Sequence, residues 1–427
     1  MATIYWQGQA TAVAQVDTCQ ITGYDAGSTY TLTVGGYAVS VAGTTDAAGT
    51  AAALAAAWNA ATHPYCTAVT ASSVTDTVHL TADTAGVPFV VTSSVADAGG
   101  TIGAVTASTA NAGPNVWAAA NFSGGAAPVA DDTVIFENSS VSVLWGLSNA
   151  GATLTELRIM QSYTGKIGLP EASFATSATA SDTSKPEYRD CYLIVDATLV
   201  RIGEHYGSGT PAGSGRIKID NGTVQTALVV SNSSAPSTDG NLEPIRWKGT
   251  NANNAVNVMK GRLGIATSYA GEVATVAALE IAHLGNVASD ADVNVGPGVT
   301  LAIVEQSGGE AVIQCAVTTI IEQAAGTVTT IGDGAITTVN AGGTARLQAT
   351  GTIGTLRVAG GGSADLSRDP RARTISACEL HKGGSLNLDN GNPLSITLSA
   401  GIDLIRCGLE DVTLRLGNHY TVEPTSI

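Results

Sequence analysis

The segment from Thr318 to Gly362, "TTIIEQAAGTVTTIGDGAITTVNAGGTARLQATGTIGTLRVAGGG", repeats one short phrase with variations. An apolar residue recurs in each phrase at steps of 17, 19, 17 and 22 residues, and a glycine follows it four to six positions later. Short strands separated by glycine corners at this period are typical of a parallel β-solenoid, whose coils stack so that equivalent side chains form inward ladders. The expected core ladder is Ile303, Ile320, Val339, Leu356 and Cys378, and the expected corner glycines, chosen because corners need positive φ, are Gly309, Gly326, Gly343, Gly362 and Gly384.

Composition agrees with a mainly β protein. Charged residues make up only 13% of the 427 residues and aromatic residues 5%, while glycine occurs 50 times. Few charged helix formers and many turn formers argue against a helical protein. We therefore predict a mainly β chain, a right-handed parallel β-helix with a small N-terminal α+β domain. A β-sandwich is the alternative, although the two-residue hairpin signals that it needs are scarce.

The chain divides into three predicted parts: an N-terminal α+β domain over 1–113, the parallel β-helix over 114–400 and a C-terminal cap over 401–427. In the first part, "STYTLTVGGYAVSVAG" alternates apolar and polar residues around Gly35 and Gly36, which predicts a hairpin. The alanine-rich run from Asp46 to Ala61 predicts a helix, with Leu54 and Trp58 at helical spacing. Strand patterns follow it, so one sheet face should be covered by the helix.

The charge balance limits the class of partner. The formal net charge is −16, and an acidic surface repels phosphate backbones, so we expect no nucleic-acid binding.

The N-terminus lacks the pattern of a secretory signal, and no run approaches the length of a membrane span, so synthesis in the cytoplasm and no membrane insertion are expected. The six cysteines are widely spaced and are interpreted as free thiols.

Two patterns could hold a metal, and both are incomplete. Asp290, Asp292 and Asn294 alternate as in the start of a calcium loop, but Val295 and Leu301 stand where that loop needs Gly and Glu. Glu280 and His283 have the spacing of metal ligands on a helix, and no second such motif accompanies them. We expect an exposed strand edge and a surface pair, with no metal and no cofactor.

Paired carboxylates are the remaining route to chemistry, because solenoids can hydrolyse glycans with two acids on one face. No cluster of aromatic residues accompanies the pairs to bind sugar rings, and no metalloprotease or serine-hydrolase motif occurs. We therefore expect solvated surface acids and no enzyme. The pairs are Asp131 and Asp132, Glu187 and Asp190, Asp365 and Asp369, and Glu410 and Asp411.

The basic segment "SRDPRAR" is unusual in so acidic a chain. Arg368, Arg371 and Arg373 could dock an acidic partner or the next subunit, or they could form a solvated loop with local pairing to Asp369. Cys378 stands where the other phrases carry Ile, Val or Leu, so we expect a buried small apolar residue there and not a nucleophile.

The start of the second part, with the pattern W-x3-N-F-S-G-G-x2-P-x3-D-T-V-I from Trp117 to Ile135, resembles the first turn of bacterial parallel β-helix proteins such as adhesin passenger domains and phage spikes. There the aromatic residue and the Gly-Gly-Pro turn cap the first coil. The stretches "ANAGPNVWAAANFSGG" to "LRIMQSYTGKIGLP" and "ADLSRDPRARTISACEL" are similar to phage and prophage virion-surface proteins of the head-decoration or spike type.

This resemblance implies a structural protein of the phage virion exterior, most plausibly a trimeric capsid decoration or spike that assembles in the host cytoplasm. Its expected partners are two further copies of itself and other virion proteins such as the major capsid protein. A tail spike or fibre that binds host surface glycans, with or without hydrolysis, is one alternative. A bacterial surface adhesin is the other.

Overall fold

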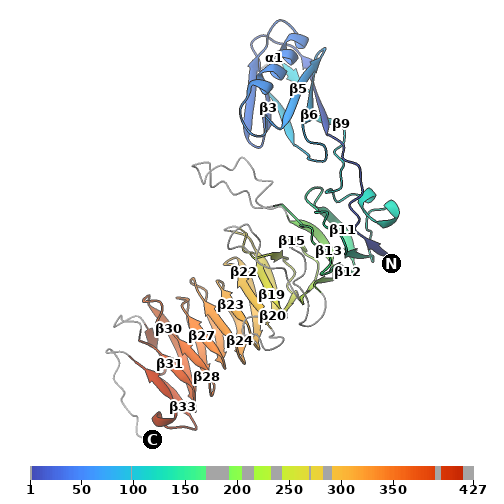
Figure 1. Ribbon diagram of the computed structural model, residues 1–427. Helices are drawn as coiled ribbons and strands as arrows, with labels where there is room; N and C mark the ends of the chain where they lie inside the picture. Colours follow the sequence, from blue (N-terminus) through green and yellow to red (C-terminus); the bar gives the residue numbers. More distant parts are fainter. Residues whose placement is uncertain are drawn as a thin grey trace.

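The computed structural model describes residues 2–97, 99–169, 192–203, 216–231, 243–268, 271–281, 291–389 and 396–416. About half of the described residues lie in strands and 7% in helices, so the prediction of a mainly β protein is confirmed. The chain forms an elongated array of parallel strands, which we call the stack, and a small unit at one end of it, which we call the head (Figure 1). The head spans residues 13–109, and the stack comprises residues 3–6 and the described part of 114–416.

Two long parallel sheets make up the stack, one of 14 strands and one of 12. In spatial order the first sheet contains β1 (Thr3–Tyr5), β10 (Thr133–Phe136), β12 (Glu156–Ile159), β14 (Leu199–Ile202), β16 (Ala227–Val230), β18 (Ala255–Val258), β20 (Ala274–Ile281), β22 (Val299–Gln306), β24 (Val317–Gln323), β26 (Ile336–Ala341), β28 (Ile353–Val358), β30 (Arg373–His381) and β32 (Ile396–Leu398), with β33 (Asp403–Ile405) also pairing with β30. The second sheet contains β11 (Ser148–Leu154), β13 (Leu193–Ala197), β15 (Ile217–Asp220), β17 (Ile245–Lys248), β19 (Gly261–Ile265), β21 (Ala291–Val295), β23 (Glu310–Ile313), β25 (Thr327–Thr330), β27 (Thr344–Leu347), β29 (Ser363–Asp365), β31 (Ser385–Asn387) and β34 (Thr413–Arg415).

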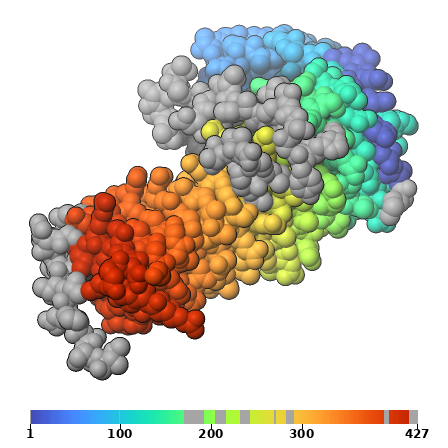
Figure 2. Space-filling view, turned by 60° about the horizontal axis from the view of Figure 1, so that its bottom comes forward, coloured from blue at the N-terminus to red at the C-terminus, as the bar shows by residue number. Residues whose placement is uncertain are grey.

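From β10 to β32 successive strands alternate between the two sheets, so each pass of the chain adds one strand to each sheet. We call one such pass a rung. Colours in Figure 2 follow one another along the stack from green to red, because each rung lies on the preceding one. Parallel strands that are neighbours in space but separated by a crossover require this kind of winding. The arrangement is consistent with a β-solenoid.

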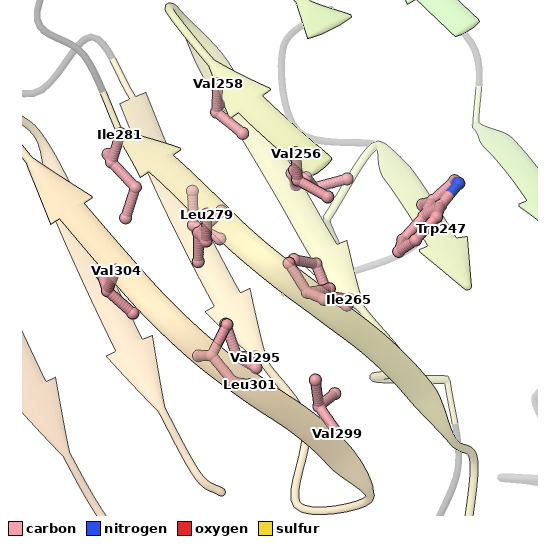
Figure 3. Close-up of a cluster of buried hydrophobic side chains, with 14 of the residues drawn as sticks. Trp247, Val256, Val258, Ile265, Leu279, Ile281, Val295, Val299, Leu301 and Val304 are labelled. Carbon is pink, nitrogen blue, oxygen red and sulfur yellow. The ribbon is translucent and has the colours of Figure 1, made fainter. Parts of the chain in front are cut away.

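Buried side chains form continuous ladders between the two sheets. Figure 3 shows Val256, Leu279 and Val304 of the first sheet and Ile265 and Val295 of the second with their side chains in one apolar cluster. One ladder of the first sheet runs in register through Ile4, Val134, Leu157, Val200, Leu228, Val256, Leu279, Val304, Ile321, Val339, Leu356 and Cys378. All of its members are buried.

Three of the five predicted ladder residues are therefore correct, and two are wrong by one position. Ile303 and Ile320 pair with each other but are only half-buried, whereas their neighbours Val304 and Ile321 occupy the core. In β22 two consecutive residues, Ala302 and Ile303, are half-buried between buried positions, and the register shifts there. The register irregularity at that point interrupts the alternation expected of a flat strand.

Each predicted corner glycine lies between strands, directly before a strand of the second sheet, and glycine is needed there for different reasons. Gly309 and Gly326 have φ of 69° and 85°, the left-handed region that favours glycine. Gly343, Gly362 and Gly384 do not have positive φ, so the conformational reason given for them is wrong. Close stacking of rungs requires Gly343 and Gly362 instead, since a Cβ on Gly362 would lie 2.0 Å from the carbonyl oxygen of Ala341 in the rung below.

Aromatic rings close the N-terminal end of the stack. Trp117 and Phe122, from the motif singled out in the sequence, pack edge to face at 4.9 Å, and Phe122 packs in the same way on Trp6 at 5.3 Å. Phe136 of β10 stacks on Trp6 at 5.6 Å and contacts Tyr163 at 5.1 Å. These rings are buried, so large flat side chains cover the end of the first rung.

The head consists of two antiparallel sheets and one helix. One sheet contains β5 (Val69–Val74), β6 (Thr77–Ala82), β2 (Val16–Gly23) and β8 (Thr101–Ile102), with β9 (Thr106–Thr109) also on β2; the other contains β4 (Tyr37–Ala42), β3 (Thr29–Val34) and β7 (Val91–Ala96). The predicted hairpin is confirmed, with Val34 paired to Tyr37 across Gly35 and Gly36. So is the predicted helix, α1 (Ala47–Ala60), which buries Leu54 and Trp58 and begins where the Asp46 side chain accepts a hydrogen bond from the Gly49 N–H at 2.7 Å.

The head is inserted into the stack and does not precede it. β1 pairs with β10, and Ile4 and Trp6 belong to the core of the stack, so the predicted domain start at residue 1 needs correction. At the other end, the described part of the predicted cap, 401–416, continues both sheets through β33 and β34. Three further elements complete the description: η1 (Ala119–Asn121), η2 (Ser123–Gly125) and η3 (Leu409–Asp411).

Candidate functional site

The arginine segment forms the loop between β29 and β30, and two of its guanidinium groups are exposed. The side chains of Arg368 and Arg371 are 53% and 57% exposed. Each is paired within the loop: Arg368 Nε lies 3.1 Å from an oxygen of Asp365, and Arg371 Nη2 lies 2.6 Å from an oxygen of Asp369. The hydrogen bond from Arg371 holds the pKa of Asp369 down at about 2. Local pairing, which the sequence left open, is therefore present.

Arg373 is not a docking residue, and that part of the prediction is wrong. Its side chain is fully buried. The guanidinium donates hydrogen bonds to the backbone carbonyls of Leu347 and Asp369, so it joins the loop to the rung below. A buried guanidinium that satisfies carbonyl groups fixes backbone position, and here it fixes the loop that carries the two exposed arginines.

Three of the four predicted carboxylate pairs contain an acid with a structural contact. Asp132 is buried and accepts hydrogen bonds from the backbone N–H groups of Ala2 and Val129, at 2.8 and 3.0 Å, so it anchors the first strand. Asp411 pairs with Lys382 at 2.9 Å, and this contact lowers the pKa of Asp411. Asp365 is held by Ser367 and Arg368. Glu187 and Asp190 lie outside the described residues.

The structure gives the surroundings of only some residues of the two incomplete metal patterns. Glu280 lies in β20, so the helical interpretation of that stretch is wrong, and His283 lies outside the described residues. Asp290 is also outside them, while Asp292 pairs with Arg262 at 3.1 Å. In the part of the chain that the structure describes, no group of three or more His, Cys, Asp or Glu side chains is arranged to hold a metal ion.

The cysteines behave as predicted where they can be seen. Cys19, Cys66, Cys315 and Cys378 are buried free thiols and Cys407 is a half-buried one, while Cys191 lies outside the described residues. Burial raises the pKa of the Cys378 thiol to about 12, so it carries almost no thiolate near neutral pH. The prediction that Cys378 is a buried apolar residue is confirmed.

Sequence reasoning missed a charged cluster on the outer face of the second sheet, which we define as Lys218, Arg246, Lys248, Glu243 and Glu272. Both lysines, Arg246 and Glu272 are buried. Arg246 lies 3.3 Å from Glu243, and the Lys248 ammonium lies 3.9 Å from Glu272. Charged groups are seldom buried unless they are paired, so this concentration marks the outer face of β15 and β17 as a distinct site.

A tyrosine and a serine adjoin the charged cluster. Tyr192 is buried, and its ring faces the ammonium groups of Lys248 and Lys218, at 4.6 and 5.3 Å from the ring centre. Its hydroxyl hydrogen-bonds Ser268, whose backbone N–H in turn donates to Glu272 at 2.7 Å. Burial raises the pKa of Tyr192, so its hydroxyl stays protonated at neutral pH.

One row of acids continues from the charged cluster along the same face. Asp292 of β21 is in register with Glu310 of β23, and Glu243 lies near enough to act on Asp292 electrostatically. Burial raises the pKa of Asp292, and the neighbouring carboxylates add to this effect against the opposing influence of Arg262. Register partners on adjacent parallel strands are about 4.8 Å apart at the backbone. A carboxyl group with a raised pKa beside a second acid can give and take protons.

The missed residues carry only a faint sequence signal. In "IKID" and "IRWK" a charged residue alternates with Ile or Trp, which is the ordinary pattern of a strand with one wet face. Their burial depends on what packs over the outer face of the sheet, and the alternation of charged and apolar residues along the strand cannot show that. Comparison with protein-family models, curated proteins and solved structures finds no significant match to this chain.

Proposed function

We propose that the chain is a structural protein of a phage virion exterior, a trimeric capsid decoration or spike whose stack is a closed, right-handed parallel β-helix. The observation that carries the proposal is the mechanical character of the molecule: a long series of rungs in register, with the head attached at one end through two adjacent chain segments. Each rung buries apolar side chains against its neighbours, which gives a stiff rod. Right-handed winding is the usual hand of parallel crossovers.

Asn121 supports this picture, because it holds the two segments that join head and stack. Its buried side chain accepts a hydrogen bond from Ala10 N–H at 2.8 Å and donates to the carbonyls of Gly113 and Val116, each at 2.7 Å. The chain entering the head and the chain leaving it are thus tied to one residue. A head held in this way suits anchoring, with the rod projecting from or clamping the particle.

The remaining partners follow from the same proposal. Two further copies and other virion proteins such as the major capsid protein are the expected contacts, and assembly takes place in the host cytoplasm. Among the described residues, no helix is long and apolar enough to cross a membrane.

Electron microscopy of intact particles with this chain gold-labelled tests the proposal. Label over the whole head in hundreds of copies supports a decoration protein, label confined to the tail in tens of copies supports a spike or fibre, and unlabelled particles overturn the virion role. Sedimentation of the purified chain tests the trimer, and a monomer at micromolar concentration contradicts it.

A second candidate, a tail spike that binds and hydrolyses host glycans, is favoured by the row of acids. Burial raises the pKa of Asp292, which is the direction that favours a general acid, and Glu310 is the carboxylate one rung away. A reducing-end assay on host surface polysaccharide tests it. Sustained sugar release that disappears in Asp292→Asn but persists in Asp365→Asn supports hydrolysis, and no release removes it.

A further inference from the structure

The head differs from the rest of the chain in the sign of its charged residues. Residues 13–109 contain six Asp and neither Lys nor Arg, which gives a formal charge of −6, while all 19 Lys and Arg residues lie further along the chain. Asp46, Asp83 and Asp97 are exposed, and Asp17 is the one Asp of the six that is buried. A unit without any cation at its surface attracts positively charged partners and repels acidic ones.

The head also exposes apolar side chains more than the stack does. Eleven large apolar side chains are exposed among the described residues, and six of them lie between residues 13 and 90 although that segment is a small part of the chain: Val13, Tyr24, Tyr37, Val74, Val87 and Val90. Val90 is 77% exposed, the highest value of the set. Scattered apolar residues are ordinary on a surface, so an interaction region has to be sought where several of them lie next to one another.

Three rings of this region lie next to one another at one end of the sheet β4-β3-β7. Tyr37 lies against His63 with ring centres 4.3 Å apart and an angle of 13° between the planes, and Tyr65 lies 5.4 Å beyond His63. Val34 pairs with both Tyr37 and Val91, so Val90 adjoins the same end of the sheet. We call Tyr37, His63, Tyr65 and Val90 the ring patch.

We propose that the ring patch is the contact surface through which the head binds a basic protein surface, one that presents Arg side chains to the tyrosine rings. This inference rests on the anchoring role proposed above and names the partner's chemistry. Aromatic faces attract guanidinium and ammonium groups, and Arg stacks on Tyr in preference to Lys. Tyrosine is enriched at interfaces because it adds contact area with little loss of side-chain freedom. A neutral glycan would gain nothing from the charge of the head.

Full-length protein titrated with the peptide Arg-Gly-Arg-Gly-Arg-Gly-Arg-Gly, followed by NMR of the tyrosine and histidine ring protons, tests the proposal. Shifts confined to the rings of Tyr37, His63 and Tyr65, with weaker binding as salt is raised, are expected. Tyr37→Ala should weaken the apparent affinity roughly two- to five-fold, the range of an exposed cation–π contact. Tyr5→Ala is the matched control, because Tyr5 has nearly the same exposure, 39% against 37%, but belongs to the stack.

Several outcomes overturn the proposal. Equal weakening by Tyr5→Ala, or shifts spread over the whole acidic surface, would mean that the peptide binds by net charge alone. Ring shifts with the neutral sugar maltohexaose and none with the peptide would assign the patch to a glycan. A matching Lys peptide that binds as tightly as the Arg peptide would remove the stacking argument. None of these results depends on particle labelling, so the ring patch can fail while the virion role stands, and the reverse.

Discussion

The head and the stack solve the same problem, burying apolar surface with β-strands, in opposite ways. In the head, antiparallel strands and α1 enclose one small core that contains Trp58 and Tyr30. In the stack, each buried side chain has an equivalent in the next rung, and no single residue is central. The comparison teaches that the head should respond to a core substitution as a whole, whereas the stack should respond locally, since rungs are coupled to their neighbours.

The largest effect is expected from Trp58→Ala in the head. The ring is fully buried, and its N–H donates to the carbonyl of Val69 at 2.8 Å, so its removal leaves a cavity and an unsatisfied carbonyl. A loss of about 3–5 kcal/mol is expected. Calorimetry of the full chain should show the transition of the head lowered or absent and that of the stack unchanged, with Thr62→Ala as the exposed control. A single transition that moves as one would remove the distinction between the two units.

A slightly smaller, local effect is expected from Leu356→Ala in the stack. Leu356 contacts the core between Val339 and Cys378 in the ladder, and its truncation should cost about 2–5 kcal/mol. Hydrogen exchange should accelerate in β26, β28 and β30 and stay slow in β14 and β16. Thr355→Ala, at the half-buried neighbouring position, is the control. Uniform acceleration along the stack would contradict local coupling.

The arginine loop gives a sharper contrast within the stack. Arg373→Ala removes hydrogen bonds to two backbone carbonyls and should cost about 1.5–3 kcal/mol, because hydrogen bonds of a charged group are involved. Arg371→Ala removes an exposed ion pair and should therefore destabilise the protein clearly less than Arg373→Ala. Denaturant unfolding of the two variants measures the difference. An equal loss of stability in the two variants would contradict the structural role assigned to Arg373.

The smallest effect is a pH dependence from Asp369. Its pKa in the folded protein, about 2, lies below the ordinary value of 3.8, so its contribution to stability is present above pH 4 and is lost as the pH falls toward 2. The unfolding midpoint of the wild type should therefore drop more steeply between pH 4 and pH 2 than that of Asp369→Asn. Parallel curves for the two proteins would show that the pair with Arg371 has no influence.

Much of the fold could be predicted from the sequence because the stack is repetitive. A strand assigned in one repeat is supported by the equivalent strand in the next. The period indicated the rungs, and alanine spacing indicated α1. The errors at Ile303 and Ile320 arose where two apolar residues stand side by side, as in Ile320-Ile321. Both satisfy a hydrophobic pattern, and the register irregularity that places the second in the core depends on how the strands pair in three dimensions.

The candidate sites were harder to predict, because the roles of their residues depend on contacts distant in sequence. Nothing in "SRDPRAR" distinguishes Arg373, whose guanidinium reaches Leu347 in another rung, from Arg371, which reaches Asp369 two residues away. The Gln306 and Gln323 side chains illustrate the same limit. They look like surface residues, yet both are buried, and Gln323 donates to Gln306 at 3.1 Å between rungs.

Because the head is inserted between β1 and β10, the first strand of the stack is synthesised long before the strand with which it pairs. While the chain is being synthesised, Thr3–Tyr5 emerges more than a hundred residues before Thr133–Phe136, to which it pairs. The head can fold during this interval, because its two connections to the stack lie side by side. There the Val13 N–H donates a hydrogen bond to the Ala112 carbonyl at 2.8 Å. Neighbouring ends of this kind suit replacement: another domain whose termini lie close together could be grafted there without breaking the rod.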